Sequence, residues 1–373
     1  MPAQGACFPL NGPVTKHLAV LGGGVIGLSI AWRAAARGHR VTVFDPAPGR
    51  GASWLAGGML APVTEAWPGE EDVLRLGEES LRRWPAFARE LAAEGFDPGL
   101  SEKGTLVVAF DRADTGHLET LAGYLRSLGR DFETLTGREA RRLEPGIGGS
   151  VRSGLSVPGD LAVDNRKLLV ALRKAAERRG AEFVAEEVTD LTSLHQDVVV
   201  IAAGAWSSRL HPALSAAVRP LKGEILRLRP RRGSLPPPER TVRAVVEGRP
   251  IYLVPRADGE VVLGATQYEA GFDVTVTARG VRELLEGAER IFPGIAEYEL
   301  VETAAGLRAA SVDNLPFIGE LAEGVIAATG HHRHGLLLAP VTADAVVASL
   351  AGEPLPDHVA AAHPGRLKST EPV

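Results

Sequence analysis

Three glycines near the start of the chain have a spacing that suits the binding of phosphate groups. Gly22, Gly24 and Gly27 form the pattern G-x-G-x-x-G between a short apolar run and an apolar-periodic segment. In such a turn the first glycine allows a tight bend, the second lets the backbone approach a pyrophosphate, and the third lets helix and strand pack closely. Asp45 follows where a carboxylate can bind ribose hydroxyls, which favours FAD or NAD over NADP.

The elements that must position these residues follow from the flanking pattern. The apolar run at 18–21 predicts a buried strand, the periodic segment that ends at Gly38 predicts a helix, and residues 40–44 predict a second strand. A strand–helix–strand unit of this length implies parallel strands joined by a right-handed crossover. The phosphates of a dinucleotide would then meet free N–H groups at the start of the helix.

The rest of the chain contains segments typical of a buried parallel sheet with helices and segments typical of an antiparallel sheet. The continuous apolar run 197–203 predicts a strand buried on both faces of a sheet. The apolar stretch 336–350 contains Pro340 and Asp344 and falls short of the roughly 18 apolar residues of a membrane span, so it predicts a buried helix. Further helices are predicted at 71–93, 113–128, 165–179 and 281–291. Further strands are predicted at 104–110 and, in a mainly antiparallel sheet, at 219–229, 241–246, 250–255 and 261–264.

Composition excludes several classes of protein. The 373 residues carry a net charge of −5 and 45% hydrophobic residues, which is ordinary globular composition for one large or two interlocked domains. Without a basic excess we expect no binding to nucleic acid or to a membrane surface. Cys7 is the only cysteine, which excludes disulfides and cysteine-based metal or iron–sulfur sites within the chain. With no signal peptide visible at 1–16, we expect a cytoplasmic protein.

Several further segments carry a family resemblance. RGASWLAGGMLAP (50–62) and DVVVIAAGAWSS (197–208) resemble the second and third flavin segments of the D-amino-acid oxidase and sarcosine oxidase superfamily. An NAD-dependent dehydrogenase would leave both segments unexplained. Five more segments are similar to the glycine oxidase family of thiamine biosynthesis, and the resemblance spans about residues 17–352. They are RPLKGEILRL (219–228), IYLVPR (251–256), GATQYEAGFD (264–273), AGLRAASVDNLPFIG (305–319) and the terminal flavin loop TGHHRHGLLLAP (329–340).

The resemblance implies an α/β fold in which a glutathione-reductase-type FAD-binding Rossmann domain joins a second, mainly antiparallel α+β substrate domain. The FAD-binding domain would be discontinuous, with residues 17–95, 150–210 and 305–352, and the substrate domain would take 96–149 and 211–304. FAD would bind noncovalently, since a cysteinyl flavin would require Cys7 to enter the site. The implied cofactor contacts are Gly22, Gly24, Val25, Ile26, Gly27, Asp45, Ser53, Ala56, Gly57, Gly58, Met59, Val188, Ala203, Gly204, Trp206, Gly306, Gly330, His332, Arg333, His334, Gly335 and Leu336.

Oxidation of an amino acid requires an anchored carboxylate and a correctly aimed Cα–H bond. A guanidinium anchors a carboxylate by bidentate pairing, which lysine cannot reproduce. By resemblance, Arg308 within AGLR is this clamp, Tyr252 donates its hydroxyl to the same carboxylate, and Arg333 lies near substrate and flavin. For each residue a purely structural role is the alternative: an ion pair, a core tyrosine, or bonds to backbone carbonyls.

Other residue groups have weaker interpretations. His331, His332 and His334 cannot all face one ion from a loop, and no remote cysteine or acidic motif joins them, so we predict no metal site. The absence of G-x-S-x-G argues against a serine hydrolase of the nucleophile-elbow type. Lys222 has two interpretations: a flavin neighbour that favours reaction with dioxygen, or a structural ion pair.

Three positions depart from the family pattern. Ala309 replaces the usual proline after the AGLR arginine, Gln267 stands where an apolar side chain is usual, and the terminal loop reads His332–Arg333–His334 where aromatic–Arg–Asn is common. These side chains could line the substrate pocket, so they affect the expected substrate more than the expected flavin chemistry.

The resemblance implies oxidation of glycine and small amines or amino acids to a 2-oxo acid, ammonia and hydrogen peroxide, with dioxygen as acceptor, for synthesis of the thiamine thiazole. One alternative is a D-amino-acid oxidase or dehydrogenase for larger substrates, because the same clamp serves both and pocket size decides. A flavin-binding protein without catalysis is a second alternative, but it would not require Arg308 and Tyr252. We also expect a homo-oligomer of undefined size.

Overall fold

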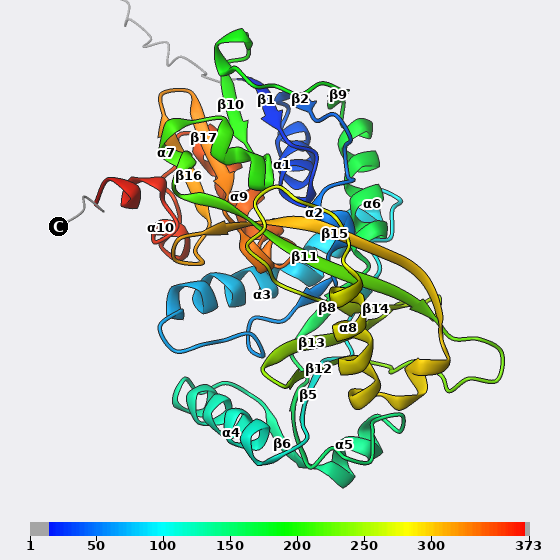
Figure 1. Cartoon of the computed structure of the whole chain (residues 1–373). Coiled ribbons are helices and arrows are strands. Elements are labelled where there is room, and N and C mark those ends of the chain that lie inside the picture. Colours follow the sequence, from blue (N-terminus) through cyan, green and yellow to red (C-terminus); the bar gives the residue numbers. More distant parts are fainter. Residues whose placement is uncertain (1–14, 370–373) are drawn as a thin grey trace, which may run out of the picture.

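The computed structural model describes residues 15–369 and contains a six-stranded, an eight-stranded and a three-stranded sheet (Figure 1). In the six-stranded sheet the order is β16-β17-β10-β1-β2-β9, and all neighbours run parallel except β16 and β17. The predicted strand–helix–strand unit and its parallel strands are therefore confirmed. The bounds are β1 (His17–Leu21), β2 (Arg40–Phe44), β9 (Glu182–Val184), β10 (Val198–Ile201), β16 (Phe317–Ala322) and β17 (Val325–Thr329).

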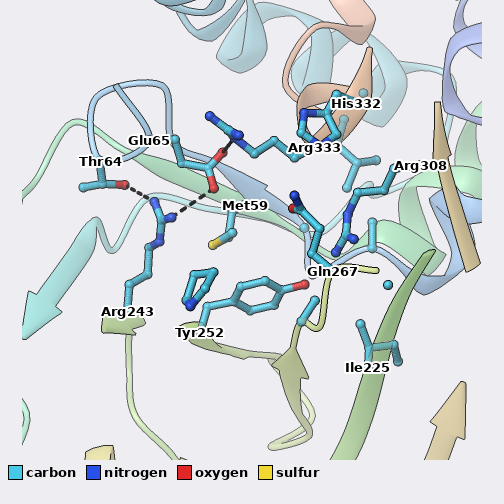
Figure 2. Close-up of a pocket in the computed structure, with 18 of the residues that line it drawn as sticks. Met59, Thr64, Glu65, Ile225, Arg243, Tyr252, Gln267, Arg308, His332 and Arg333 are labelled. Atoms are coloured by element: carbon cyan, nitrogen blue, oxygen red, sulfur yellow. Dashed lines mark hydrogen bonds and ion pairs between the residues drawn. The ribbon is translucent and has the colours of Figure 1, made fainter. Parts of the chain in front are cut away.

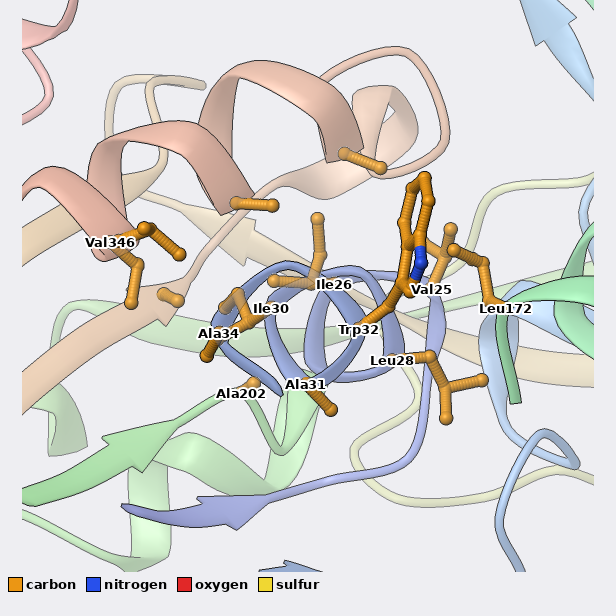
Figure 3. Packing of buried hydrophobic residues seen from close by; sticks show 14 of the residues in the cluster. Val25, Ile26, Leu28, Ile30, Ala31, Trp32, Ala34, Leu172, Ala202 and Val346 are labelled. Carbon is orange, nitrogen blue, oxygen red and sulfur yellow. The ribbon is translucent and has the colours of Figure 1, made fainter. Parts of the chain in front are cut away.

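Both faces of this sheet are buried, because the strand residues that face each side are apolar. Leu18 and Val20 face a core built with helix α1, while Ala19 and Leu21 face a second core on the opposite side. Helix α1 is buried almost all round, as expected for a helix that is apolar on every face, and it packs between α6 and α9 (Figure 3). The bounds are α1 (Val25–Ala36), α3 (Glu71–Ala93), α6 (Asn165–Arg178) and α9 (Ala339–Leu350).

The eight-stranded sheet has the order β15-β11-β14-β13-β12-β5-β7-β6 and is antiparallel apart from the β12–β5 pair. Helix α8 (Ala278–Ile291) packs on one face, and α4 (Arg112–Ser127) packs on the other face near β5 and β7. The strand bounds are β5 (Thr105–Ala109), β6 (Glu133–Thr136), β7 (Ser153–Val157), β11 (Val218–Arg229), β12 (Thr241–Val246), β13 (Arg249–Pro255), β14 (Val261–Gly264) and β15 (Glu299–Ser311).

Two long strands cross the middle of the molecule. Strands β11 and β15 are paired along nearly their whole length, from Val218 opposite Ser311 to Arg229 opposite Glu299 (Figure 1). A bridge between Ala310 and His331 joins β15 to the loop that follows β17. The ladder therefore connects the six-stranded sheet to the eight-stranded sheet.

Short elements complete the fold. The small antiparallel sheet has the order β3-β8-β4. These elements are β3 (Met59–Leu60), β4 (Leu100–Ser101), β8 (Leu161–Val163), α2 (Ala52–Leu55), α5 (Gly137–Leu143), α7 (Pro212–Ser215), α10 (Asp357–Ala360), and the 3₁₀ turns η1 (Leu191–Ser193), η2 (Gly204–Arg209), η3 (Pro293–Glu297), η4 (His332–His334) and η5 (Pro364–Ser369).

The strands can be compared with the predicted domain ranges. Strand β7 lies within 150–210 and the end of β15 lies within 305–352, yet both strands pair in the eight-stranded sheet. The ranges predicted for the FAD-binding domain therefore include strands of the second sheet, because pairing over long distances in the chain leaves no local signal. Within the stretch 336–350, residues Ala339–Leu350 form the buried helix α9, so the predicted buried helix is present. Among residues 15–369 no helix is long and apolar enough to cross a membrane.

Candidate active site

A cavity of about 540 Å³ lies at the carboxyl ends of the parallel strands β1, β2, β10 and β17. Ligands of open parallel sheets bind at this edge, where strand ends and helix starts meet. Most of the predicted cofactor contacts line this cavity. They are Gly22, Gly24, Val25, Ile26, Asp45, Ser53, Val188, Ala203, Gly204, Trp206, Gly330, His332 and Gly335.

The glycine motif shapes the wall of this cofactor cavity. Gly22 has a φ of +110°, and a Cβ there would lie 2.4 Å from the Ala202 carbonyl oxygen. A Cβ at Gly27 would lie 1.8 Å from the carbonyl oxygen of Gly22, so Gly27 permits strand–helix packing but does not line the cavity. The N-cap residue of α1, Gly24, offers no side-chain cap, and the Ser53 hydroxyl accepts the N–H of Val25 at 3.0 Å. The other N–H groups at this helix start fit a pyrophosphate.

Asp45 follows β2 and faces the same cavity. Its carboxylate accepts hydrogen bonds from the N–H groups of Gly23 at 2.6 Å and Ala47 at 2.7 Å. A carboxylate oxygen can accept more than one hydrogen bond, so each oxygen can still receive a ribose hydroxyl. Asp45 therefore both holds the glycine turn and fits the predicted contact with ribose.

Two buried polar side chains hold the second flavin segment in place. The Asn165 amide, at the start of α6, donates to the carbonyl oxygens of Ser53 at 2.9 Å and Trp54 at 2.8 Å. Arg256 donates to the carbonyl oxygen of Gly57 at 2.7 Å and to the Asn165 side chain at 3.0 Å. Burial lowers the pKa of Arg256 to about 10, so its guanidinium is still charged at neutral pH. The sequence analysis did not single out either residue.

A second cavity of about 510 Å³ continues from the first toward the eight-stranded sheet. The two cavities share Ala52, Ser53, Arg308, His332 and Gly335 in their linings. Except for Gly27 and His334, the remaining predicted cofactor contacts line this second cavity, as do all three predicted catalytic residues. They are Ala56, Gly57, Gly58, Met59, Tyr252, Gly306, Arg308, Arg333 and Leu336.

Arg308 is held on β15 with its guanidinium against a glycine of β11. A Cβ at Gly223 would lie 2.2 Å from Nη1 of Arg308, so any larger residue would displace this side chain. Nη1 donates to the carbonyl oxygen of Thr266 at 3.2 Å. Among the described residues, Arg308 has no carboxylate partner within 4.0 Å, unlike the other two arginines of this cavity, Arg243 and Arg333. Its charge is therefore available for an anionic ligand (Figure 2).

Tyr252 reaches the cavity from β13, on the sheet face opposite α8. Its ring lies against two glycines, because a Cβ at Gly57 or at Gly264 would lie within 3 Å of ring atoms. Burial raises the pKa of Tyr252, and the nearby charge of Arg308 partly offsets this rise. The phenol is therefore neutral at physiological pH and can donate a hydrogen bond to a carboxylate held by Arg308.

An ion-pair network forms another wall of the second cavity. Glu65 forms ion pairs with Arg243 at 3.1 Å and with Arg333 at 3.8 Å, its carboxylate lies 3.4 Å from the His334 ring, and Arg333 also pairs with Glu70 at 3.1 Å. Burial alone would raise the pKa of Glu65, but the charges of Arg243 and Arg333 hold it below its ordinary value. Arg333 lines the cavity as predicted, with its charge balanced inside the protein. A direct contact with substrate or flavin stays a prediction.

A buried carboxyl group lies behind this wall. Thr64 donates its hydroxyl to Asp160 at 2.8 Å and accepts a hydrogen bond from Arg243 at 3.0 Å. Asp160 is fully buried, and its Oδ1 has no hydrogen-bond partner among the described residues. Burial raises the pKa of Asp160 to about 7. No local sequence pattern indicates this buried carboxyl group.

The three loop histidines have different surroundings. His331 contacts the Thr342 hydroxyl at 3.0 Å, His334 faces Glu65, and His332 lines both cavities. His334 lies outside both cavity linings, so its predicted cofactor contact stays untested. Burial lowers the pKa of His331 and of His332 to about 3 and that of His334 to about 4. Within residues 15–369 no group of three or more potential ligands could hold a metal ion.

The position of Lys222 is consistent with a structural ion pair, the second of its two interpretations. Gly223 and Ile225 of β11 line the second cavity, and alternate residues of a strand face opposite sides. Lys222 and Glu224 are therefore turned away from the cavity. The Lys222 ammonium pairs with Asp273 at 2.6 Å and is nearly fully buried. Cys7, the residue considered for a covalent flavin, lies outside the described residues.

The fold and the two connected cavities define a dinucleotide-dependent oxidoreductase with separate cofactor-binding and substrate-binding parts. The chain belongs to the FAD dependent oxidoreductase (DAO) family, whose model matches residues 17–349. The predicted FAD dependence and the predicted fold class are thereby confirmed.

The chain is similar to proteins named as glycine oxidases and to a protein named ThiO. It is 35% identical over 346 residues to the glycine oxidase of Geobacillus kaustophilus, covering 87% of this chain and 90% of that one. It is 36% identical over 341 residues to the protein named as a thiamine biosynthesis oxidoreductase, ThiO, of Rhizobium etli, covering 90% and 97%. The crystal structure of glycine oxidase from Geobacillus kaustophilus matches with a TM-score of 0.85 at 33% identity, over 94% of this chain and 98% of that one.

Proposed function

We propose that this protein is an FAD-dependent glycine oxidase that converts glycine, dioxygen and water to glyoxylate, ammonia and hydrogen peroxide. The observation that carries the proposal is the charge of Arg308, which lies in a cavity continuous with the cofactor cavity and has no carboxylate partner within residues 15–369. Similarity to glycine oxidases at 35% identity supports the same activity.

The side chains of the second cavity act mainly by positioning. Arg308 pairs with the substrate carboxylate, and the neutral Tyr252 hydroxyl donates to the same group. Two contacts to one carboxylate limit the rotation of the substrate and aim its Cα–H bond, and such positioning can contribute about 7–11 kcal/mol to catalysis. Bound FAD supplies the capacity to accept two electrons from the substrate and to pass them to dioxygen.

Neither the loop histidines His332 and His334 nor Glu65 is a strong general base near neutral pH. The rings of His332 and His334 are uncharged, but a group whose conjugate acid has a pKa of about 3 or 4 takes up protons weakly. Glu65 is held ionised by its arginine partners, which makes it a weak base too. We therefore propose that the substrate amine loses its proton to solvent before the Cα–H bond breaks.

The wider biological setting extends this proposal. Similarity to ThiO of Rhizobium etli at 36% identity supports a role in thiamine thiazole synthesis. We further propose that the enzyme is cytoplasmic. We also propose that it binds FAD without a cysteinyl bond, since the only cysteine of the sequence, Cys7, precedes the first strand in the chain. Assembly into a homo-oligomer stays a prediction.

A second candidate function is oxidation of larger D-amino acids. The second cavity extends past the clamp to Trp67, His117 and Leu121, and Trp67 and His117 stack with their ring centroids 5.3 Å apart. An apolar side chain could occupy this end while its carboxylate pairs with Arg308. The same clamp serves both functions, so a comparison of substrates decides between them.

The purified enzyme should be yellow, contain one FAD per chain and release it intact on acid denaturation. Peroxide release should be highest with glycine in a panel that includes sarcosine, D-alanine, D-proline and D-phenylalanine. A colourless protein that binds NAD, or flavin that stays on the denatured chain, would contradict the cofactor proposal. Higher catalytic efficiency with D-phenylalanine than with glycine would favour the second candidate function.

Breaking of the Cα–H bond should limit the rate of flavin reduction. In single-turnover stopped flow, Cα-deuterated glycine should reduce the flavin more slowly than ordinary glycine. His332→Ala and His334→Ala should each keep the rate of this step within about tenfold of wild type, because a true general base contributes roughly 10²–10⁴-fold. A larger loss in either variant, with flavin content unchanged, would instead indicate base-assisted proton removal.

A further inference from the structure

We infer that Gln267 is a specificity-determining residue that accepts a hydrogen bond from the substrate amine and favours primary over N-alkylated amines. The inference rests on the proposed function, since it concerns the amine of a substrate whose carboxylate is held by Arg308. Gln267 lines the second cavity and has a largely exposed side chain there. Its amide makes no hydrogen bond with any described residue.

The backbone on both sides of Gln267 is fixed. The Thr266 hydroxyl accepts the N–H of Glu224 at 2.9 Å, and Tyr268 exchanges two backbone hydrogen bonds of 2.9 Å with Lys222. The Tyr268 hydroxyl donates to Glu283 on α8 at 3.1 Å. Since the flanking side chains contact β11 and α8, the side chain between them faces the opposite side, where the cavity lies.

The same short segment contacts both groups that hold the carboxylate. The Thr266 carbonyl accepts a hydrogen bond from Arg308 at 3.2 Å, and a Cβ at Gly264 would lie 2.3 Å from the Tyr252 hydroxyl oxygen. Figure 2 shows the Gln267 side chain between Arg308 and Tyr252. In an α-amino acid the amine is only two bonds from the carboxylate carbon, so a carboxylate at Arg308 brings the amine near Gln267.

Gln267 is the side chain best suited to accept an amine hydrogen at this end of the cavity. Guanidinium groups only donate, whereas the carboxamide oxygen of Gln267 can accept and has no partner among the described residues. The Glu65 carboxylate is engaged by Arg243, Arg333 and His334. A neutral primary amine offers two N–H donors, whereas an N-methyl amine offers one and a bulkier group. The carboxamide oxygen therefore binds a primary amine more favourably than an N-methyl amine.

The test compares glycine with sarcosine in wild type and in Gln267→Met, which keeps the side-chain length but removes the acceptor. We expect kcat/KM for glycine to fall about tenfold, as for the loss of one hydrogen bond, while kcat/KM for sarcosine changes less than about threefold. Tyr268→Phe is the matched control, because its hydroxyl contacts Glu283 away from the cavity. The control should leave the glycine-to-sarcosine ratio of wild type unchanged.

Two results would overturn the inference. If Gln267→Met lowers kcat/KM for both substrates equally, or leaves both unchanged, Gln267 does not distinguish a primary from an N-methyl amine. Flavin content measured for each variant identifies loss of folding, and Gln267→Leu then provides a second apolar replacement that must show the same change in ratio. A wild-type enzyme that oxidises neither substrate would overturn the proposed function itself, and that result comes from the wild-type measurements alone.

Discussion

Replacement of Arg308 by alanine should lower kcat/KM for glycine by about 30-fold to several thousandfold while FAD remains bound. Loss of one partner from a desolvated, hydrogen-bonded charge pair costs about 2–5 kcal/mol. Arg308→Lys should also be poor, because a single ammonium cannot form the paired hydrogen bonds of a guanidinium. The readout is peroxide release over a range of glycine concentrations, together with the flavin absorbance of each variant.

A surface arginine of the same strand ladder provides the control. Arg219 lies on β11 outside both cavities and pairs with the exposed Glu269 at 2.9 Å. Arg219→Ala should keep glycine kinetics close to wild type, since exposed ion pairs contribute little. Near-normal glycine kinetics in Arg308→Ala would show that another group holds the carboxylate.

The second large effect concerns stability rather than catalysis. Burial raises the pKa of Asp160 from 3.8 to about 7, so the folded state holds this proton more tightly than the unfolded state. Below about pH 4 Asp160 is protonated in both the folded and the unfolded state, so its titration does not change the stability of the protein. Between about pH 4 and 7 only the unfolded state has lost the proton, so stability falls as pH rises and reaches its full loss above pH 7. One pKa unit corresponds to 1.36 kcal/mol, which makes the full loss about 4 kcal/mol.

Asp160→Asn removes this titration while keeping an oxygen that can accept the Thr64 hydroxyl. The variant should match wild type near pH 4 and resist urea better than wild type at pH 8. Unfolding of the FAD-bound enzyme in urea at both values measures the difference. Asp131→Asn, at an exposed position, should follow wild type at both pH values. A variant that is weaker than wild type at pH 8 would show that Asp160 is ionised and stabilising in the folded protein.

The parts of the site that were predicted from the sequence depend on short segments of the chain. Gly22 to Gly27 form their turn from neighbouring residues, and Asp45 follows in the next strand, so one βαβ unit contains the whole signal. Arg308 and Tyr252 were predicted only through resemblance, because β13 and β15 are far apart in the sequence and meet through β11 and β14.

The ion-pair wall could not be predicted in the same way. Glu65, Arg243 and Asp160 come from three distant segments, and each alone resembles an ordinary surface charge. Their burial follows from how the eight-stranded sheet packs on the segment after β3, which no local pattern encodes. Strand β7 was assigned to the other part of the molecule for the same reason, since its partners β5 and β6 are identified only by long-range pairing.

The paired strands β11 and β15 also limit how the molecule can open. Arg308 lies opposite Leu221, three pairs from the Val218–Ser311 end of this ladder, which runs from one sheet to the other. A hinge motion that separates the two sheets would break consecutive backbone hydrogen bonds of this ladder. We therefore expect such a motion to be energetically costly. We therefore expect substrate and product to pass by local movements where the second cavity reaches the exposed Trp67 and its neighbour His117. In that case the clamp would keep its position while these side chains move.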